Sequence, residues 1–65
     1  MDQQATYDDV RLGDMVTGNG TWEVLWKEDG LICLRFYRTD KGQYGGIMRF
    51  SAGNFDQFNF RKVQQ

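Results

Sequence analysis

Two runs of alternating apolar residues dominate the middle of the chain. Residues 21–28 and 31–38 each place three large apolar side chains two positions apart: Trp22, Val24 and Trp26 in the first run, and Ile32, Leu34 and Phe36 in the second. A period of two is the period of a strand with one buried face. The two runs therefore predict an antiparallel hairpin whose turn lies at residues 28–30.

The length of this turn sets which apolar residues share a face. A two-residue turn at Asp29-Gly30 would place Trp26 beside Cys33 and divide the six apolar residues between the two faces. A three-residue turn over 28–30, closed by a left-handed glycine, gathers all six on one face, with the pairs 26–32, 24–34 and 22–36. We therefore predict the three-residue turn.

Two further turns extend this hairpin into a β-meander. A turn at 40–42 predicts the pairs 36–46, 34–48 and 32–50, which add Met48 and Phe50 to the core face and set Gly46 against the ring of Phe36. Gly18-Asn19-Gly20 predicts a turn that sets Val16 against Trp22. On the opposite face, Glu23 lies across from Arg35 as a favourable charge pair.

The end of the chain predicts a short helical turn and a last strand. Phe55 and Phe58 are three residues apart, which is the spacing of one 3₁₀ turn, and residues 60–63 return to a strand pattern. Five short strands with a helical turn before the fifth are the layout of the SH3-like small barrels.

The chain resembles this superfold, in its KOW and Tudor-like form, through several segments: Leu12-Gly13-Asp14-Met15-Val16, Trp22-Glu23-Val24, Asp29-Gly30 and residues 55–63. The resemblance implies an all-β, five-stranded SH3-like barrel built on the meander. It places a single domain at 10–63, a flexible N-terminal segment at 1–9 and a tail at 64–65. The chain is also similar in size and composition to short accessory proteins of phages and plasmids.

Composition argues against catalysis. The 65 residues include no His and one Cys, Cys33, so the common zinc and iron–sulfur ligand sets are missing. The adjacent carboxylates Asp8 and Asp9, and Glu28 and Asp29, lie in an expected tail and a turn, where they are exposed to water and not set in a catalytic pocket. We therefore expect no enzyme, no metal and no cofactor.

Two further features bear on location. The chain has no apolar run of the roughly 18 residues that cross a bilayer, and the segment MDQQATYDDV lacks the basic and apolar regions of a secretory signal. We therefore expect a cytoplasmic protein with no membrane partner.

Charge is divided along the chain. Residues 1–30 carry two basic and seven acidic residues, and residues 31–65 carry six basic and two acidic residues. The acidic half predicts a carboxylate surface for a basic partner, made by Asp8, Asp9, Asp14, Glu28 and Asp29. Our first hypothesis is a non-enzymatic protein-binding module, of the kind a phage uses to inhibit or modulate a larger nucleic-acid-handling protein.

The face of the meander opposite the core predicts a second contact surface. Leu25, Cys33 and Ile47 would form an apolar patch there with a rim of Arg35 and Arg49, which is a common composition for a partner surface. The same patch could pair with its own copy in a homo-oligomer. Trp26, near the hairpin end, is the tryptophan expected to touch a ligand.

The alternative function is binding of single-stranded nucleic acid. Cations and rings are interleaved in the second half of the chain, as in small barrels that bind single strands: Arg35, Tyr37, Arg38, Lys41, Tyr44 and Arg49. The sequence pI of about 5.1 is low for a dedicated nucleic-acid binder, so this function ranks second.

Overall fold

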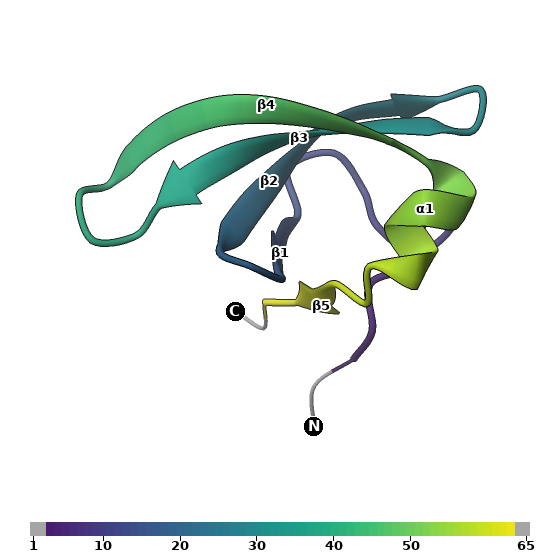
Figure 1. Cartoon of the computed structure of the whole chain (residues 1–65), viewed down its shortest axis with the longest axis horizontal. Helices are drawn as coiled ribbons and strands as arrows, with labels where there is room; N and C mark the ends of the chain where they lie inside the picture. The colour runs from purple at the N-terminus through teal and green to yellow at the C-terminus, as the bar shows by residue number, and fades with distance from the viewer. Residues whose placement is uncertain (1–2, 64–65) are drawn as a thin grey trace.

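Five antiparallel strands and one short helix make up the fold (Figure 1). The computed structural model describes residues 3–63. The elements follow one another as β1 (Met15–Thr17), β2 (Thr21–Glu28), β3 (Leu31–Arg38), β4 (Gln43–Ser51), α1 (Ala52–Gln57) and β5 (Arg61–Lys62). The sheet order is β4-β3-β2-β1-β5. The five predicted strands are confirmed, but β4 and β5 remain the two edges of one open sheet, so the sheet is not closed into a barrel.

The turn between β2 and β3 differs from the prediction. Glu28 pairs with Leu31, so the turn has only two residues, Asp29 and Gly30. Both have positive φ angles, 53° and 76°, as a type I′ turn requires. The twist of such a turn matches the twist of the strands that it joins. The predicted three-residue turn is therefore wrong.

A β-bulge in β2 reconciles the short turn with the predicted core. The register shifts between Val24 and Trp26, and Leu25 is left without a partner in β3. Below the bulge the predicted pairs 22–36 and 24–34 are confirmed. Above it Trp26 pairs with Cys33 instead of Ile32, so the predicted pair 26–32 is wrong.

The bulge also exchanges the faces of two side chains. Trp26 turns away from the core and is 37% exposed, although its spacing predicted a core residue. Lys27 takes the core side, opposite Ile32. Its stem is accommodated because the ammonium group donates to the Tyr7 carbonyl and lies 4.9 Å from the centroid of the Tyr7 ring.

The hairpin of β3 and β4 contains a second irregularity. The predicted pairs 34–48 and 32–50 are confirmed, but the register shifts between Arg35 and Tyr37. The predicted pair 36–46 is therefore wrong. A Cβ atom at Gly45 would lie 3.3 Å from the Phe36 ring, whereas one at Gly46 would meet open space. Gly45, not Gly46, is the glycine that leaves room for this ring.

The core lies on one side of the sheet. Its buried members come from the N-terminal segment, from β1, β2, β3 and α1, and from the residue before β5: Ala5, Val10, Val16, Val24, Ile32, Leu34, Phe55 and Phe60. The predicted pair of Val16 with Trp22 is confirmed. Met48 faces this side but remains 44% exposed, contrary to the prediction, because β4 is an edge strand with a neighbour on one side only.

Helix α1 replaces the predicted 3₁₀ turn. Ser51 caps it, because its side-chain oxygen accepts a hydrogen bond from the Asn54 amide at 3.3 Å. The helix buries Phe55, whose ring stacks on Phe60 at a centroid distance of 5.0 Å. The last strand, β5, is two residues long and pairs with β1.

The N-terminal segment packs on the domain along its described residues. We expected 1–9 to lie outside the domain, but Ala5 is fully buried and its amide donates to the Phe60 carbonyl at 2.7 Å. The Lys62 amide donates to the Gln3 carbonyl at 3.0 Å, so this segment lies along β5. Residues 1–2 of the expected segment, and the expected tail 64–65, fall outside the described residues.

The turn before β2 gives a test of this packing. Gly20 has a φ of 109°, and a Cβ atom there would overlap the Phe36 ring. We expect Gly20→Ala to lower the free energy of unfolding by about 2 kcal/mol or more, from backbone strain and overpacking. Urea denaturation measures this change. Gly53→Ala is the matched control, because a Cβ atom there meets nothing within 4 Å in a helix; an equal loss in both variants would contradict the packing.

Candidate interaction surface

The side of the sheet opposite the core presents an uncovered surface, called here the outer face. Residues that pair directly across strands share a face, and alternate residues of one strand do so too. The outer face therefore consists of four cross-strand rows: Glu28, Leu31 and Ser51; Trp26, Cys33 and Arg49; Glu23, Arg35 and Ile47; and Thr21, Tyr37 and Tyr44. Helix α1, β5 and the N-terminal segment lie on the core side of the sheet (Figure 1).

Arg35 occupies the centre of the outer face. Its guanidinium group pairs with the Glu23 carboxylate at 2.9 Å, which confirms the predicted charge pair. The same group lies 3.7 Å from the centroid of the Tyr44 ring, and the Tyr44 and Tyr37 rings are 5.1 Å apart. Arg35 is therefore held by an ion pair and a cation–π contact, which fixes Tyr44 in place.

The apolar groups of the outer face are distributed differently from the predicted patch. Cys33 is only 2% exposed, since it lies in the inner strand β3, with Trp26 of β2 paired on one side and Arg49 of β4 on the other. Leu25 is half-buried in the bulge. Ile47 is 58% exposed, and Tyr44 and Trp26 are also exposed. A partner on this face would therefore meet Ile47, Tyr44 and Trp26.

Strand β4 adds an unpaired backbone edge to this surface. Every residue from Gln43 to Arg49 is exposed. Within residues 3–63 nothing pairs with the free side of β4, whereas the free side of β5 is paired with the N-terminal segment through Gln3 and Ala5. An exposed edge of this length tends to pair with another chain.

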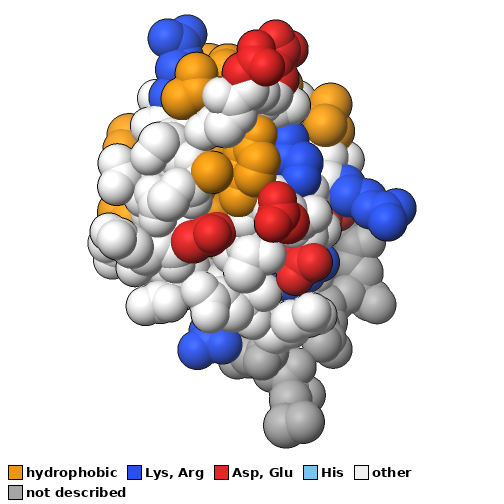
Figure 2. All heavy atoms as spheres, turned by 90° about the vertical axis from the view of Figure 1, so that its right-hand side faces the viewer, with side chains coloured by type: hydrophobic (Ala, Val, Ile, Leu, Met, Phe, Trp, Pro, Cys, Tyr) orange, Lys and Arg blue, Asp and Glu red, His pale blue; other side chains and the backbone are white. Residues whose placement is uncertain are grey.

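The predicted acidic residues lie at several separate places. Asp8 and Asp9 are exposed in the turn after Tyr7, and Glu28 and Asp29 are exposed at the β2–β3 turn. Tyr7 connects the two places, because its hydroxyl oxygen accepts the Gly30 amide at 3.1 Å. The carbonyl of the same residue accepts the ammonium of Lys27, which brings a cation between them. Figure 2 shows acidic side chains in separate groups with apolar and basic side chains between them.

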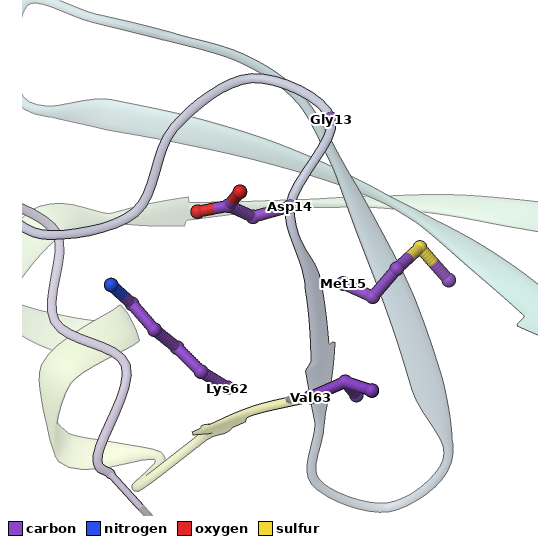
Figure 3. A pocket seen from close by; sticks show the side chains of 5 residues that line it. All are labelled: Gly13, Asp14, Met15, Lys62 and Val63. Carbon is purple, nitrogen blue, oxygen red and sulfur yellow. The ribbon is translucent and has the colours of Figure 1, made fainter. Parts of the chain in front are cut away.

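Asp14 lies apart from the other acidic residues, in a hollow of about 310 Å³ beside β1 and β5. Asp14 and Lys62 point to one side of β1, and Met15 and Val63 point to the other (Figure 3). The Asp14 carboxylate accepts the Arg11 amide at 2.9 Å, and the Lys62 ammonium donates to the Asp9 carbonyl at 3.3 Å. These two charges hold the N-terminal segment in place and are already engaged by it.

The residues of the nucleic-acid alternative all belong to the β3–β4 hairpin. The structure brings Arg35, Tyr37, Tyr44 and Arg49 together on the outer face and leaves Arg38 and Lys41 at the adjoining turn. Arg38 lies 3.8 Å from the Asp40 carboxylate. Arg49 and Lys41 have no ion-pair partner among the described residues.

Two further features of the described part of the chain concern metal ions and membranes. This part contains no group of three or more His, Cys, Asp or Glu side chains that could hold a metal ion. Its one helix is too short to cross a membrane.

Two parts of this surface were not predicted from the sequence. The first is the edge position of β4, which a strand followed by a helix, not by another hairpin, could have indicated. The second is Phe58, which is 47% exposed beside β4. The spacing of Phe55 and Phe58 placed both on one helical turn, but only the packing shows that Phe55 is buried and Phe58 is not.

Comparison of the chain with models of protein families, with curated proteins and with solved structures finds no match. The geometry of the outer face and of the β4 edge is therefore the basis of the proposed function.

The reactivity of the Cys33 thiol tests how side chains pack on the outer face. We expect the thiol of the folded chain to react with an aromatic disulfide reagent at least about tenfold more slowly than the thiol of the unfolded chain. Trp26→Ala removes a cross-strand neighbour and should speed the reaction in the folded state. Tyr44→Ala, two rows away on the same face, should leave the rate unchanged. A Cys33 thiol that reacts at the unfolded rate in the folded chain would refute this placement.

Proposed function

We propose that the chain is a small, non-enzymatic protein-binding module that engages its partner through the outer face and the free edge of β4. The observation that carries this proposal is the exposure of Ile47 and Tyr44 on a nine-residue edge strand, β4, whose side facing away from β3 has no backbone partner in the described chain. Edge strands with exposed apolar side chains are a recognised mode of protein association.

The surface has the composition of an interaction hot spot. Trp, Tyr and Arg are the residue types most enriched in such places, and the outer face contains Trp26, Tyr37 and Tyr44 with Arg35 and Arg49. Arg35 holds Tyr44 through the cation–π contact, which reduces the conformational freedom that Tyr44 would lose on binding.

The acidic residues support the predicted carboxylate surface for a basic partner less well, including a surface that would imitate the charge of nucleic acid. A mimic of nucleic acid needs a continuous acidic surface, whereas the described acidic side chains lie in separate groups with Lys27 and Lys62 beside them. The proposed contact surface is therefore the sheet, and the partner is not restricted to a class such as nucleic-acid-handling proteins.

A matched pair of variants tests the proposed function. Ile47→Asp places a carboxylate in the centre of the proposed interface, so we expect at least about a tenfold loss of partner capture from nuclease-treated lysate. Leu12→Asp is the control, because Leu12 is 64% exposed in the turn before β1. Both variants should keep the unfolding transition of the parent chain. Equal capture by the parent and the Ile47→Asp variant would refute the proposal.

Binding of single-stranded nucleic acid is the second candidate, because the structure gathers unpaired Arg49 and Lys41 and the rings of Tyr37 and Tyr44 on one hairpin. One side of the Tyr44 ring is occupied by Arg35, which reduces the surface available for stacking.

Salt dependence tests this second candidate. Affinity for an oligothymidylate should fall steeply with salt, and Arg49→Gln with Lys41→Gln should reduce the slope of log K against log salt by about 1.4, or about 0.7 for each lost phosphate contact. Fluorescence anisotropy measures both slopes. A weak signal that does not change with salt would exclude this function.

A further inference from the structure

We infer that the partner presents an extended segment of alternating acidic and apolar residues, which adds to β4 as a further strand of the sheet. This inference rests on the proposed function and names the chemistry of the partner. It is carried by the backbone edge of β4, by an apolar hollow on one side of that edge and by free cations on the other.

The backbone edge is the first requirement. Alternate N–H and C=O groups of an edge strand point away from its single neighbour and can bind another strand. Such a strand cannot add at β5, since residues 3–5 already lie along it through the Ala5 amide and the Gln3 carbonyl. Strand β4 is therefore the edge on which an extended segment can pair, and its regular part, residues 47–51, includes Arg49 and Phe50.

A hollow on the core side of β4 gives the apolar half of the pattern. Its volume is about 360 Å³, and it is lined by Phe50, Asn54, Gln57 and Phe58. The Phe58 ring packs at 5.2 Å from Phe50 and 5.1 Å from Phe60, measured between centroids, so the floor of the hollow is aromatic and well supported. A strand beside β4 would direct alternate side chains to the core side, and the side chain level with Phe50 would reach this hollow, where an apolar group packs on the Phe50 and Phe58 rings.

Cations on the outer side of β4 give the acidic half of the pattern. Arg49 is exposed on the outer face next to the edge and has no ion pair within the described chain. Four of the five charged residues between 31 and 51 are basic: Arg35, Arg38, Lys41 and Arg49, against Asp40. Arg35 is paired with Glu23, and Arg38 lies near Asp40. Arg49, with Lys41 at the adjoining turn, therefore supplies the positive charge that an outward-facing carboxylate of an added strand would meet.

A second copy of the chain fits this edge less well. Pairing of β4 with itself would bring together two hairpins of the same positive sign, including both copies of Arg49 and Lys41. Like charges brought close together across an interface oppose association. Self-association is thus an outcome that the experiment must detect.

Three synthetic peptides of about eight residues test the inference, at a length that matches a typical strand. One alternates Glu and Val, one alternates Lys and Val, and one alternates Glu and Ser. Fluorescence anisotropy with the full chain at about 150 mM salt should show the Glu–Val peptide binding at least about tenfold more tightly than either of the others.

Backbone methylation of the Glu–Val peptide tests strand addition itself. N-methyl groups on one set of alternate residues should abolish binding, and N-methyl groups on the other set should leave it largely intact, because only alternate amides face β4. Equal effects of the two methylation patterns, or none, would overturn the inference.

Variants of the chain test the two sides of the edge. Arg49→Glu should reverse the preference to the Lys–Val peptide, whereas Arg61→Glu, on the exposed end of β5, should not. Asn54→Trp should fill the hollow and weaken the Glu–Val peptide at least about tenfold without disturbing the core, since Asn54 is exposed on α1. Unfolding transitions confirm that each variant is folded.

Other outcomes separate this inference from the proposed function. Concentration-dependent dimerisation that is abolished by Ile47→Asp would show that the partner of β4 is a second copy of the chain. Tighter binding of an oligothymidylate than of the Glu–Val peptide would show that the partner is nucleic acid. Failure of all three peptides, together with capture of a protein partner that Ile47→Asp abolishes, would overturn the inference and leave the proposed function standing.

Discussion

The β-bulge at Leu25 decides which side chains of this small protein face the core and which face the solvent. The two-residue turn at Asp29-Gly30 would by itself divide the apolar residues between the two faces. One unpaired residue in β2 restores the pairs of Trp22 with Phe36 and of Val24 with Leu34. Between the bulge and the turn, the pairing set by the two-residue turn persists. Trp26 therefore faces outward and Lys27 faces the core.

The remaining layers follow from this division. The core side of the sheet is covered by α1, β5 and the N-terminal segment, whose Tyr7 binds the inward-facing Lys27 and the turn amide of Gly30. A chain of 65 residues has no further segment in its described part to cover the opposite side. The outer face and the edge of β4 are consequently the surfaces on which a partner would gain most, since apolar and aromatic groups are exposed there.

Much of the sheet could be predicted from the sequence. The alternation of apolar residues fixes pairs such as 24–34 in the β2–β3 hairpin and 32–50 in the β3–β4 hairpin, away from the irregularity in each. The bulges could not be predicted, since one extra residue leaves the alternation intact on each side of it. The exposure of Ile47 could be predicted from its face, whereas the burial of Cys33 depends on its place in an inner strand, with neighbouring strands on both sides. The free edge of β4 and the hollow at Phe58 depend on strand order and helix packing, which local patterns do not specify.

The placement of Trp26 tests the account most directly, because the core, the outer face and the proposed interface all depend on the bulge that orients it. Proton–proton contacts measured by NMR in the folded chain would locate it. The account predicts cross-strand contacts from the Trp26 backbone and indole ring to Cys33. Contacts from Trp26 to Ile32 and to the buried rings of Phe55 and Phe60 would contradict it, because they would show a three-residue turn and no bulge.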